Sequence, residues 1–358
     1  MTIPSRPLPG VRLATREGRS SRLADIAAHA GVSESTVSRV LNEREGVALA
    51  TREAVLTAVD VLGYDRPSRL QSQAVSLVGL IIPELVNPIF PTFAQAVETS
   101  LARRGYTPVL CTQTEDGLHE DDYVEMLLER GVAGIIYISG QHADTATSLE
   151  RYQRLIDRGL PVVFVNGYRE EVAAPFVSDD DAAAMDLAVN HLVELGHRSI
   201  GLAVGPDRYV PVIRKVEGFR AAMARYVERE DVDDLIVNTL YSVEGGASAA
   251  SLLIERGATA VVCGSDPMAL GAIRQARAEG LSVPEDISVV GYDDSALIAF
   301  TDPPLTTVRQ RVKDMSQAAV RALLDAVAGN PVPHAELVFT PELVVRRSTA
   351  RVPMADLD

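Results

Sequence analysis

Most of the chain after Ala74 alternates between short apolar runs and longer amphipathic segments, and this alternation constrains the fold more than any other feature. Short apolar runs of this kind are typical of parallel strands that are buried on both faces. They cover residues 77–82, 108–111, 134–138, 161–165, 199–204, 235–237, 260–263 and 287–291. Repeated strand–helix–strand units predict an α/β fold in which parallel sheets carry helices on both faces.

The segments between these runs are predicted to be helices. They have apolar residues at helical spacing and cover residues 93–104, 123–130, 149–158, 183–195, 214–226, 247–256, 267–278 and 315–328. Several end at a glycine, which accepts the left-handed conformation of a helix C-cap: Gly105, Gly131, Gly159, Gly196, Gly257 and Gly280. The strands suffice for two subdomains, and the alternation lapses at 166–179, where we place the boundary between them.

A different pattern, at residues 22–42, predicts a helix-turn-helix near the start of the chain. Apolar residues recur at helical spacing on both sides of Gly31, which can supply the left-handed residue of the turn, and Ser33 can cap the second helix. The apolar faces consist of Leu23, Ile26 and Ala27, then Val37, Val40 and Leu41. Polar side chains that then point outward suit a DNA major groove. An ordinary α-hairpin at a domain edge is the alternative that spacing alone leaves open.

The run A-x-x-x-G-V-S-x-x-T-V-S-R-V-L-N, from Ala27 to Asn42, resembles the DNA-binding segment of the lactose repressor (LacI/GalR) family of bacterial transcription regulators. The similarity continues through V-x-x-x-T-R-E-x-V, from Val47 to Val55, and Leu62-Gly63-Tyr64 resembles the end of the family's third helix. It resumes most clearly in VPEDISVVGYDDSALIAFTDPPLTTVRQ at 283–310. The resemblance implies an N-terminal three-helix domain followed by a two-lobed, periplasmic-binding-protein-like effector domain with parallel sheets. It also implies that the chain crosses between the two lobes and that a ligand lies in the cleft between them.

These signals divide the 358 residues, too many for one ordinary core, into several parts. We expect a disordered basic arm at 1–20, a helix-turn-helix DNA-binding domain at 21–66, a short hinge at 67–74, a two-lobed effector-binding and dimerisation domain at 75–350, and a tail at 351–358. The segment 64–71 lacks the Pro-x-x-x-Ala-Arg-x-Leu pattern of the family's hinge.

The resemblance also predicts which side chains contact DNA. Arg39 is expected to contact a guanine, while Glu34 and Ser35 set the choice of operator. The full set is Ser33, Glu34, Ser35, Thr36, Ser38, Arg39, Asn42, Tyr64 and Leu70. In the atypical hinge, Leu70 either wedges into the minor groove or packs within the linker.

Ligands of open α/β sheets bind at the carboxyl ends of the strands, and several predicted strand ends carry polar or aromatic groups. Matched through the flanking motifs, these residues resemble the effector-contacting positions of the family. They are Asn87, Phe90, Asn166, Lys215, Tyr241, Ser265, Asp266, Asp293 and Gln310. Carboxylates and amides exchange hydrogen bonds with hydroxyls, and an aromatic ring can cover an apolar sugar face, so a sugar or sugar derivative is expected.

Single residues of this set have other interpretations. Asp293 could cap a helix, Asp266 before Pro267 could simply start one, and Asn87 before Pro88 could form a turn. Three positions also depart from the family. Lys215 replaces a common arginine, Ser265 replaces a common asparagine, and Gly167 lacks the arginine of some members, which leaves the ligand's identity open.

Charge is distributed unevenly along the chain. The net charge is −15, but the first 69 residues hold ten arginines against eight acidic residues, so the remainder carries −17. The acid is therefore concentrated away from the helix-turn-helix and does not exclude DNA binding. Two cysteines exclude a disulfide framework, and no apolar run is long enough for a signal peptide or a membrane span, so a cytoplasmic protein without a membrane partner is expected.

The leading hypothesis is a ligand-controlled transcription regulator, with repression the expected direction. A homodimer would present two helix-turn-helix units to an imperfectly palindromic double-stranded operator. The alternative is a transport-type sugar-binding protein, whose effector domain would look the same. An enzyme is not expected, and neither is a cofactor or metal, because the chain lacks nucleotide-binding glycine motifs and metal-ligand spacing. We expect His197 to be structural.

Overall fold

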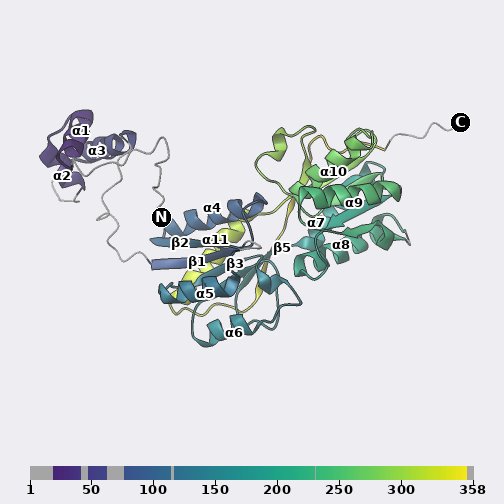
Figure 1. The fold of residues 1–358 in the computed structure, drawn as a ribbon, viewed down its shortest axis with the longest axis horizontal. Helices are drawn as coiled ribbons and strands as arrows, with labels where there is room; N and C mark the ends of the chain where they lie inside the picture. The colour runs from purple at the N-terminus through teal and green to yellow at the C-terminus, as the bar shows by residue number, and fades with distance from the viewer. Residues whose placement is uncertain (1–18, 42–46, 63–75, 114–116, 230, 353–358) are drawn as a thin grey trace, which may run out of the picture. The chain divides into compact units, whose positions relative to one another are not determined.

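The computed structural model describes residues 19–41, 47–62, 76–113, 117–229 and 231–352. The chain separates into two units, Met1–Val75 and Ser76–Asp358. The first unit contains α1 (Arg19–Ala30), α2 (Glu34–Leu41) and α3 (Leu49–Val61) (Figure 1). The predicted hinge and most of the tail lie outside the described residues, as does the predicted disordered arm except for residues 19 and 20, which instead begin α1.

The core of the first unit follows the predicted helical spacing. Ile26, Ala27, Val37, Val40 and Leu41 are buried, and α3 completes the cluster with Val55, Ala58 and Val59. Gly31 adopts φ +65° at the turn, where a side chain would be strained. The Thr36 backbone N–H donates to the Ser33 side-chain oxygen over 3.2 Å, so Ser33 caps α2 as predicted.

The second unit consists of two lobes, each built on one sheet. The first sheet has the strand order β11-β5-β4-β3-β1-β2, all parallel. Its strands are β1 (Ser76–Ile82), β2 (Tyr106–Thr112), β3 (Ile135–Ile138), β4 (Val162–Val165), β5 (Phe176–Asp179) and β11 (Glu336–Phe339). Helices α4 (Ile89–Ala102) and α11 (Val312–Val327) pack on one face. Helices α5 (Glu120–Glu129) and α6 (Glu150–Asp157) pack on the other, and η2 (Gln141–Ala143) follows β3.

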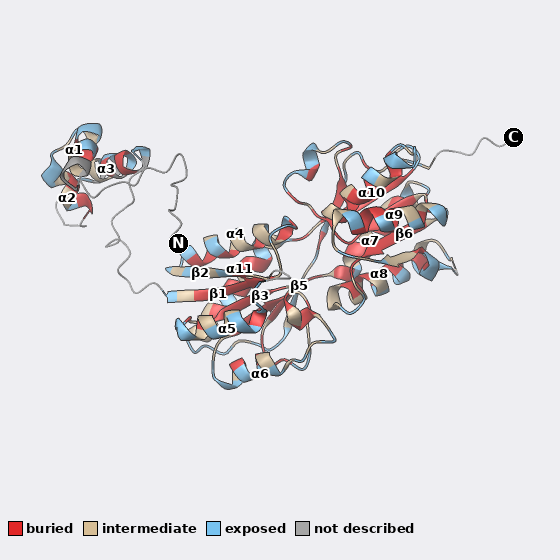
Figure 2. Cartoon of the chain, viewed as in Figure 1, coloured by how far each residue is buried: buried red, intermediate tan, exposed pale blue. Residues whose placement is uncertain are grey.

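The second sheet has the order β12-β10-β9-β8-β6-β7, and only its β12–β10 pair is antiparallel within the described residues. Its strands are β6 (Ile200–Val204), β7 (Ile236–Asn238), β8 (Ala260–Cys263), β9 (Ser288–Asp293), β10 (Thr306–Arg309) and β12 (Glu342–Val344). Helices α7 (Asp181–Glu194) and α8 (Val210–Tyr226) cover one face, and α9 (Val243–Glu255) and α10 (Asp266–Ala278) cover the other. Short 3-10 turns are η3 (Val232–Leu235) and η4 (Ile298–Phe300). Buried residues lie on the strands and on the helix faces turned toward them (Figure 2).

All eight predicted strands are present, but the predicted lobe boundary at 166–179 is correct only at its end, where the chain first leaves the first lobe. Residues Phe176–Asp179 form β5, which pairs with β4 in the first sheet. Within the described residues the chain passes between the lobes three times, after β5, after β10 and after β11. Strands β5, β10, β11 and β12 escaped prediction because each is short and polar or half-exposed, so none gives an apolar run.

No helix of the described residues is both long enough and apolar enough to cross a membrane.

Candidate effector cavity and helix-turn-helix surface

A cavity of about 330 Å³ lies between the two lobes of the second unit. Its walls come from the carboxyl ends of strands in both sheets, where ligands of open α/β sheets bind. The volume is within the range of small-molecule sites. Eight of the nine residues predicted to contact a ligand line this cavity: Asn87, Phe90, Asn166, Lys215, Tyr241, Ser265, Asp293 and Gln310.

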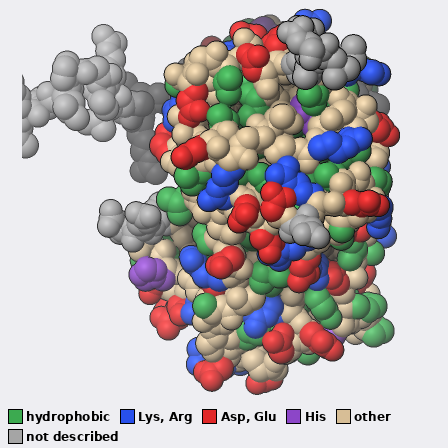
Figure 3. Space-filling view, turned by 90° about the vertical axis from the view of Figure 1, so that its right-hand side faces the viewer, with side chains coloured by type: hydrophobic (Ala, Val, Ile, Leu, Met, Phe, Trp, Pro, Cys, Tyr) green, Lys and Arg blue, Asp and Glu red, His purple; other side chains and the backbone are tan. Residues whose placement is uncertain are grey.

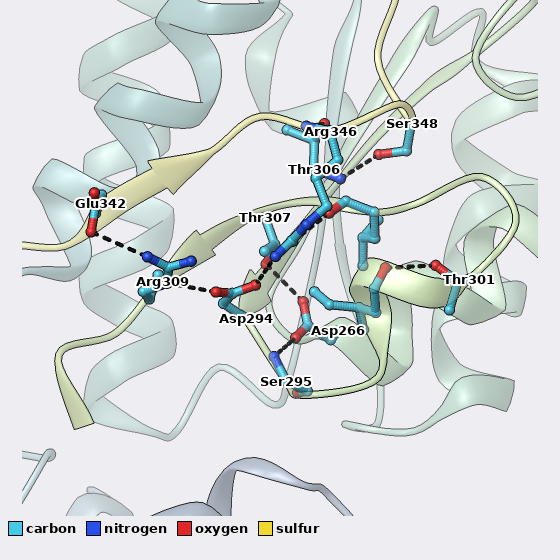
Figure 4. A network of polar contacts seen from close by, with 12 residues as sticks. Asp266, Asp294, Ser295, Thr301, Thr306, Thr307, Arg309, Glu342, Arg346 and Ser348 are labelled. Carbon is cyan, nitrogen blue, oxygen red and sulfur yellow. Dashed lines mark hydrogen bonds and ion pairs between the residues drawn. The ribbon is translucent and has the colours of Figure 1, made fainter. Parts of the chain in front are cut away.

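Asp266 is the exception, because it does not line the cavity. It is the first residue of α10, after the N-cap Ser265, and its carboxylate turns toward β9 and β10. One oxygen accepts from the Ser295 backbone N–H and the other from the Thr307 hydroxyl, both over 2.7 Å (Figure 4). Asp266 thus starts a helix, as its alternative interpretation held, and also fixes the loop that follows Asp293.

Asp293 is the last residue of β9, directly before that loop, and lines the cavity. Its backbone has φ +115°, and its carboxylate accepts from the Gln310 side-chain amide over 2.7 Å. Burial raises the pKa of Asp293 well above its usual range, and the nearby Asp266 carboxyl raises it further. No helix begins at Asp293, so the capping interpretation does not hold for this residue.

The next residue, Asp294, anchors the loop from behind. It has φ +60° and accepts from Arg309 over 2.5 Å and from Arg346 over 2.6 Å. Arg309 lies at the end of β10, one residue before Gln310, and also pairs with Glu342 of β12 (Figure 4). Because both carboxylate oxygens of Asp294 are held by arginines, the position of Asp293 is fixed by its own lobe.

Lys215 does not present an unpaired positive charge to the cavity, contrary to what the sequence alone would indicate. It lies in the second turn of α8 rather than at its start, is buried, and pairs directly with Asp181. Its ammonium group is 4.0 Å from the centre of the Tyr292 ring. Burial alone would lower the pKa of Lys215, but Asp181, Tyr241 and Asp179 together outweigh it and the pKa is raised. The cavity therefore meets a lysine whose charge is already balanced.

Tyr241 packs its ring onto bare backbone. A Cβ placed on Gly205 would lie 2.0 Å from this ring, and one on Gly264 would lie 3.3 Å from it, so the first contact leaves no room for a side chain. Burial raises the pKa of Tyr241 to about 12, so the hydroxyl stays neutral. The ring is thereby held as part of the wall of the cavity.

Two asparagine side chains of the first lobe, Asn87 and Asn166, line the cavity. The Asn87 oxygen accepts from the Ile89 backbone N–H over 3.3 Å, which is the predicted turn at Pro88. Asn166 has φ +64° and donates to the Ser139 hydroxyl over 3.1 Å. Gly167 has φ +67°, and a Cβ there would lie 2.4 Å from that of Ala143, which explains why this chain has no arginine at that position.

Sequence reasoning missed several lining residues, including Glu84, Ser139, Arg208, Tyr209 and Tyr292. Most follow predicted strands within a few residues, so the rule of inspecting strand ends could have found them. Tyr292 was not predicted because it lies in β9 itself, which extends two residues beyond the apolar run at 287–291.

On the first unit, the predicted DNA-contacting residues that the structure describes lie together at the start of α2 and along its surface. Ser33, Glu34, Ser35 and Arg39 are exposed, and Thr36 and Ser38 are half-buried. The Ser33 hydroxyl lies 2.8 Å from the hydroxyls of both Ser35 and Thr36. Asn42, Tyr64 and Leu70 lie outside the described residues.

No group of three or more His, Cys, Asp or Glu side chains in the described part of the chain is arranged to hold a metal ion. His197 contacts Thr259, Ser288 and the Ala350 carbonyl, and so ties the C-terminal segment to the second lobe.

Comparison with known proteins matches both units. Residues 22–67 match the model of bacterial regulatory proteins of the lacI family, and residues 189–349 match that of a periplasmic binding protein-like domain. The HTH-type transcriptional regulator reg1 of Streptomyces lividans is 62% identical over 338 residues, which cover 93% of this chain and 98% of that protein.

Two solved structures share the fold. A complex of the transcriptional regulator CelR with cellobiose has a TM-score of 0.69 and 32% identity, over 91% of this chain and 99% of that one. The lac repressor dimer bound to operator and the anti-inducer ONPF has a TM-score of 0.68 and 27% identity, over 92% of this chain and 98% of that one. The chain therefore belongs to the lacI family of bacterial regulatory proteins.

Proposed function

We propose that this transcriptional regulator is a homodimeric repressor that binds a palindromic operator through α2 and a neutral sugar or sugar derivative in the cavity between its lobes. The observation that carries the proposal is the convergence of eight sequence-predicted residues, from strand ends far apart in the chain, on one cavity. The CelR–cellobiose complex shares this fold, which supports a sugar as the class of ligand.

The charges around the cavity favour a neutral ligand with many hydroxyls. Lys215 forms a buried ion pair with Asp181, so it is not available to neutralise a phosphate or carboxylate, and Arg208 already pairs with Asp144. The carboxyls of Asp293 and Glu84 line the same space. Carboxylates and the amides of Asn166 and Gln310 accept from and donate to hydroxyls, while Phe90 and Tyr241 suit the apolar face of a pyranose ring.

Operator binding is assigned to the first unit because α2 presents short polar side chains and one arginine at its exposed surface. The Arg39 guanidinium has the fork geometry that pairs with the O6 and N7 atoms of guanine. On the face of the second unit in Figure 3, acidic and basic side chains are interspersed and form no basic surface for a polyanion. Effector binding would change operator affinity by its different affinity for the two lobe arrangements, on the order of 1–3 kcal/mol.

A sugar-binding protein that serves transport is the second candidate, because its cavity would look the same. The match of residues 22–67 to the lacI family favours the regulator.

The test uses duplexes selected by the full-length protein from a random pool, and a thermal-shift screen of neutral sugars. Arg39→Ala should weaken binding of the selected duplex by roughly 1–3 kcal/mol and leave the sugar-induced shift unchanged. Asp293→Ala should do the reverse, weakening sugar binding about tenfold because a hydrogen-bonding group of the cavity is lost.

Arg220→Ala serves as the matched control, since Arg220 is an exposed arginine whose partner, Asp233, lies in the same lobe. It should change neither response. A wild-type protein that selects no duplex over random competitor would overturn the proposal, and so would a protein whose melting temperature no sugar raises.

A further inference from the structure

Two loops from different lobes contact each other beside the cavity. Asp144 and Thr145 follow η2 in the first lobe, while Arg208 and Tyr209 lie between β6 and α8 in the second. The Thr145 backbone N–H and hydroxyl both donate to the Arg208 carbonyl, over 2.9 Å and 2.8 Å. Asp144 and Tyr209 also form an isolated antiparallel β-bridge, and Arg208 Nε donates to Asp144 Oδ2 over 2.7 Å. We call these four residues the inter-lobe clasp.

Each half of the clasp is shaped by its own lobe. The second Asp144 oxygen accepts from the Ala146 N–H over 2.9 Å, and the Asp144 carbonyl accepts from Arg169 over 3.3 Å. In the other half, the Arg208 guanidinium lies over the Tyr209 ring at 4.9 Å and donates to its hydroxyl over 3.3 Å. Both loops are therefore ordered before they meet, which lowers the entropy that closing the clasp would cost.

The clasp borders the cavity from both lobes. Arg208 and Tyr209 line it, and so does Ala143, which directly precedes Asp144. Asp144 and Thr145 themselves do not line it. A substitution at these two residues can therefore loosen the contact between the lobes without removing a group that faces the ligand.

Solvent access separates the contributions within the clasp. The Asp144 side chain is 14% exposed but that of Arg208 is 50% exposed, and ion pairs this open to water are weak and screened by salt. The paired hydrogen bonds to the Arg208 carbonyl do not depend on salt in this way. The clasp should thus hold by the two hydrogen bonds to the Arg208 carbonyl, one of which comes from the Thr145 hydroxyl, and be tuned by its ion pair.

We propose that the inter-lobe clasp is a gate, which holds the two lobes closed beside the cavity and must open before an effector can enter or leave. The gate sets how fast the cavity exchanges its ligand, while Asp293 and its neighbours set what is bound. The role in ligand exchange rests on the function proposed above, but the closure itself can be measured without any ligand.

The experiment places one spin label in each lobe of the full-length protein, at Glu129 on α5 and Glu255 on α9, both exposed helix ends. Labelled protein is mixed with excess unlabelled protein, so that only distances within one chain are measured. Cys111 and Cys263 are buried, and burial raises the pKa of both thiols, so they should not take the label. In the double variant Asp144→Asn with Thr145→Val, the inter-lobe distances should lengthen and broaden. Hydrogen exchange of the backbone amide at position 145 should become about tenfold faster than in the wild type, as expected when hydrogen bonds of this kind are lost.

Asp144→Asn keeps the acceptor for the Ala146 N–H, so its loop should stay folded. The matched control is Arg220→Gln, which removes an exposed ion pair of α8 within one lobe and should leave the distances at their wild-type values. Wild-type distances and amide protection in the double variant would overturn the gate.

With any neutral sugar that raises the melting temperature of the wild type, the double variant should release it faster. An unchanged release rate, despite longer distances, would refute the role of the clasp in exchange. If no sugar raises that melting temperature, the proposed function fails, and the distance measurement still decides whether the clasp holds the lobes closed.

Discussion

At the scale of single residues, His142 is a fully buried titratable group whose charge the fold controls. Its ring packs 4.7 Å from that of Phe164, and its Nε2 atom lies 2.8 Å from the Asn166 carbonyl, to which it can donate. Among the described residues nothing pairs with Nδ1. Burial lowers the pKa of His142 to about 4, so the ring is neutral in the folded protein at physiological pH.

Acid should therefore unfold the protein partly through His142. The unfolded histidine has a pKa of roughly 6.5, so its contribution is complete above that value and is lost as the pH falls toward 4. By linkage, about 2 kcal/mol of unfolding free energy should disappear between pH 7 and pH 5. Urea unfolding of the wild type and of His142→Asn at several pH values measures this, since the difference between them should shrink by that amount.

The comparison between two variants matters because other groups act in the opposite direction. Burial raises the pKa of Asp179 to about 7, so its contribution to stability grows as the pH falls. This effect is common to both proteins and cancels in the difference. A difference that stays constant from pH 7 to pH 5 would contradict the assignment to His142.

The aspartates around the cavity show how far residue-level prediction reaches. Both Asp266 and Asp293 follow strands, and the sequence places both at the correct edge of the sheet. Only Asp293 lines the cavity, because its positive φ turns the side chain there, whereas Asp266 begins a helix and points to Thr307. The direction of a side chain depends on backbone angles and partners that lie far away in the sequence, so the sequence alone could not separate the two.

At the scale of elements, local signals predicted more than long-range ones. The helix-turn-helix was predictable because its glycine, its cap and its apolar spacing all lie within twenty or so residues. Strand β11 was not, because it exists only through its pairing with β5, which is distant in the chain. Its residues Leu337 and Val338 are about half-exposed, so burial leaves no apolar pattern there.

The cap of α2 gives a prediction at this scale. Ser33→Ala removes the side-chain acceptor of the Thr36 N–H, which also donates to the Ser33 carbonyl over 2.9 Å, and should destabilise the first unit by about 1 kcal/mol. Hydrogen exchange of the Thr36 amide should rise accordingly, and operator affinity should fall because α2 frays at the end that meets the bases. Exchange in the second unit should not change.

Ser242→Ala is the matched control, because Ser242 caps α9 in the second unit by accepting from the Gly245 N–H over 3.0 Å. It should speed exchange at the start of α9 and leave Thr36 as in the wild type. Equal exchange of Thr36 in wild type and Ser33→Ala would show that the cap contributes nothing.

At the scale of the whole molecule, the two units have separate cores. The sequence predicted this separation and the two lobes behind it, since composition and alternation both change near residue 75. Chain crossovers between the lobes followed only from the family resemblance, because the sheet that a strand joins is decided by its partners and not by its own residues.

Separate cores predict that the second unit folds without the first. Deleting residues 1–73 should leave a protein whose thermal unfolding matches the main transition of the full chain, and whose response to an effector sugar is unchanged. Its affinity for the selected duplex should be lost. Calorimetry and duplex titration test this. Retained duplex affinity would show that DNA binding does not belong to the first unit.

The three passages of the chain between the lobes also limit how this protein can be recombined. Residues 76–179 need α11 and β11 from beyond residue 311 to complete their layers. The first half of the gene therefore does not encode a whole lobe, and in the second half α11 and β11 of the first lobe interrupt the second lobe. A chimera that takes one lobe from a relative needs several junctions. With a single junction, one sheet would contain an edge strand from the other protein.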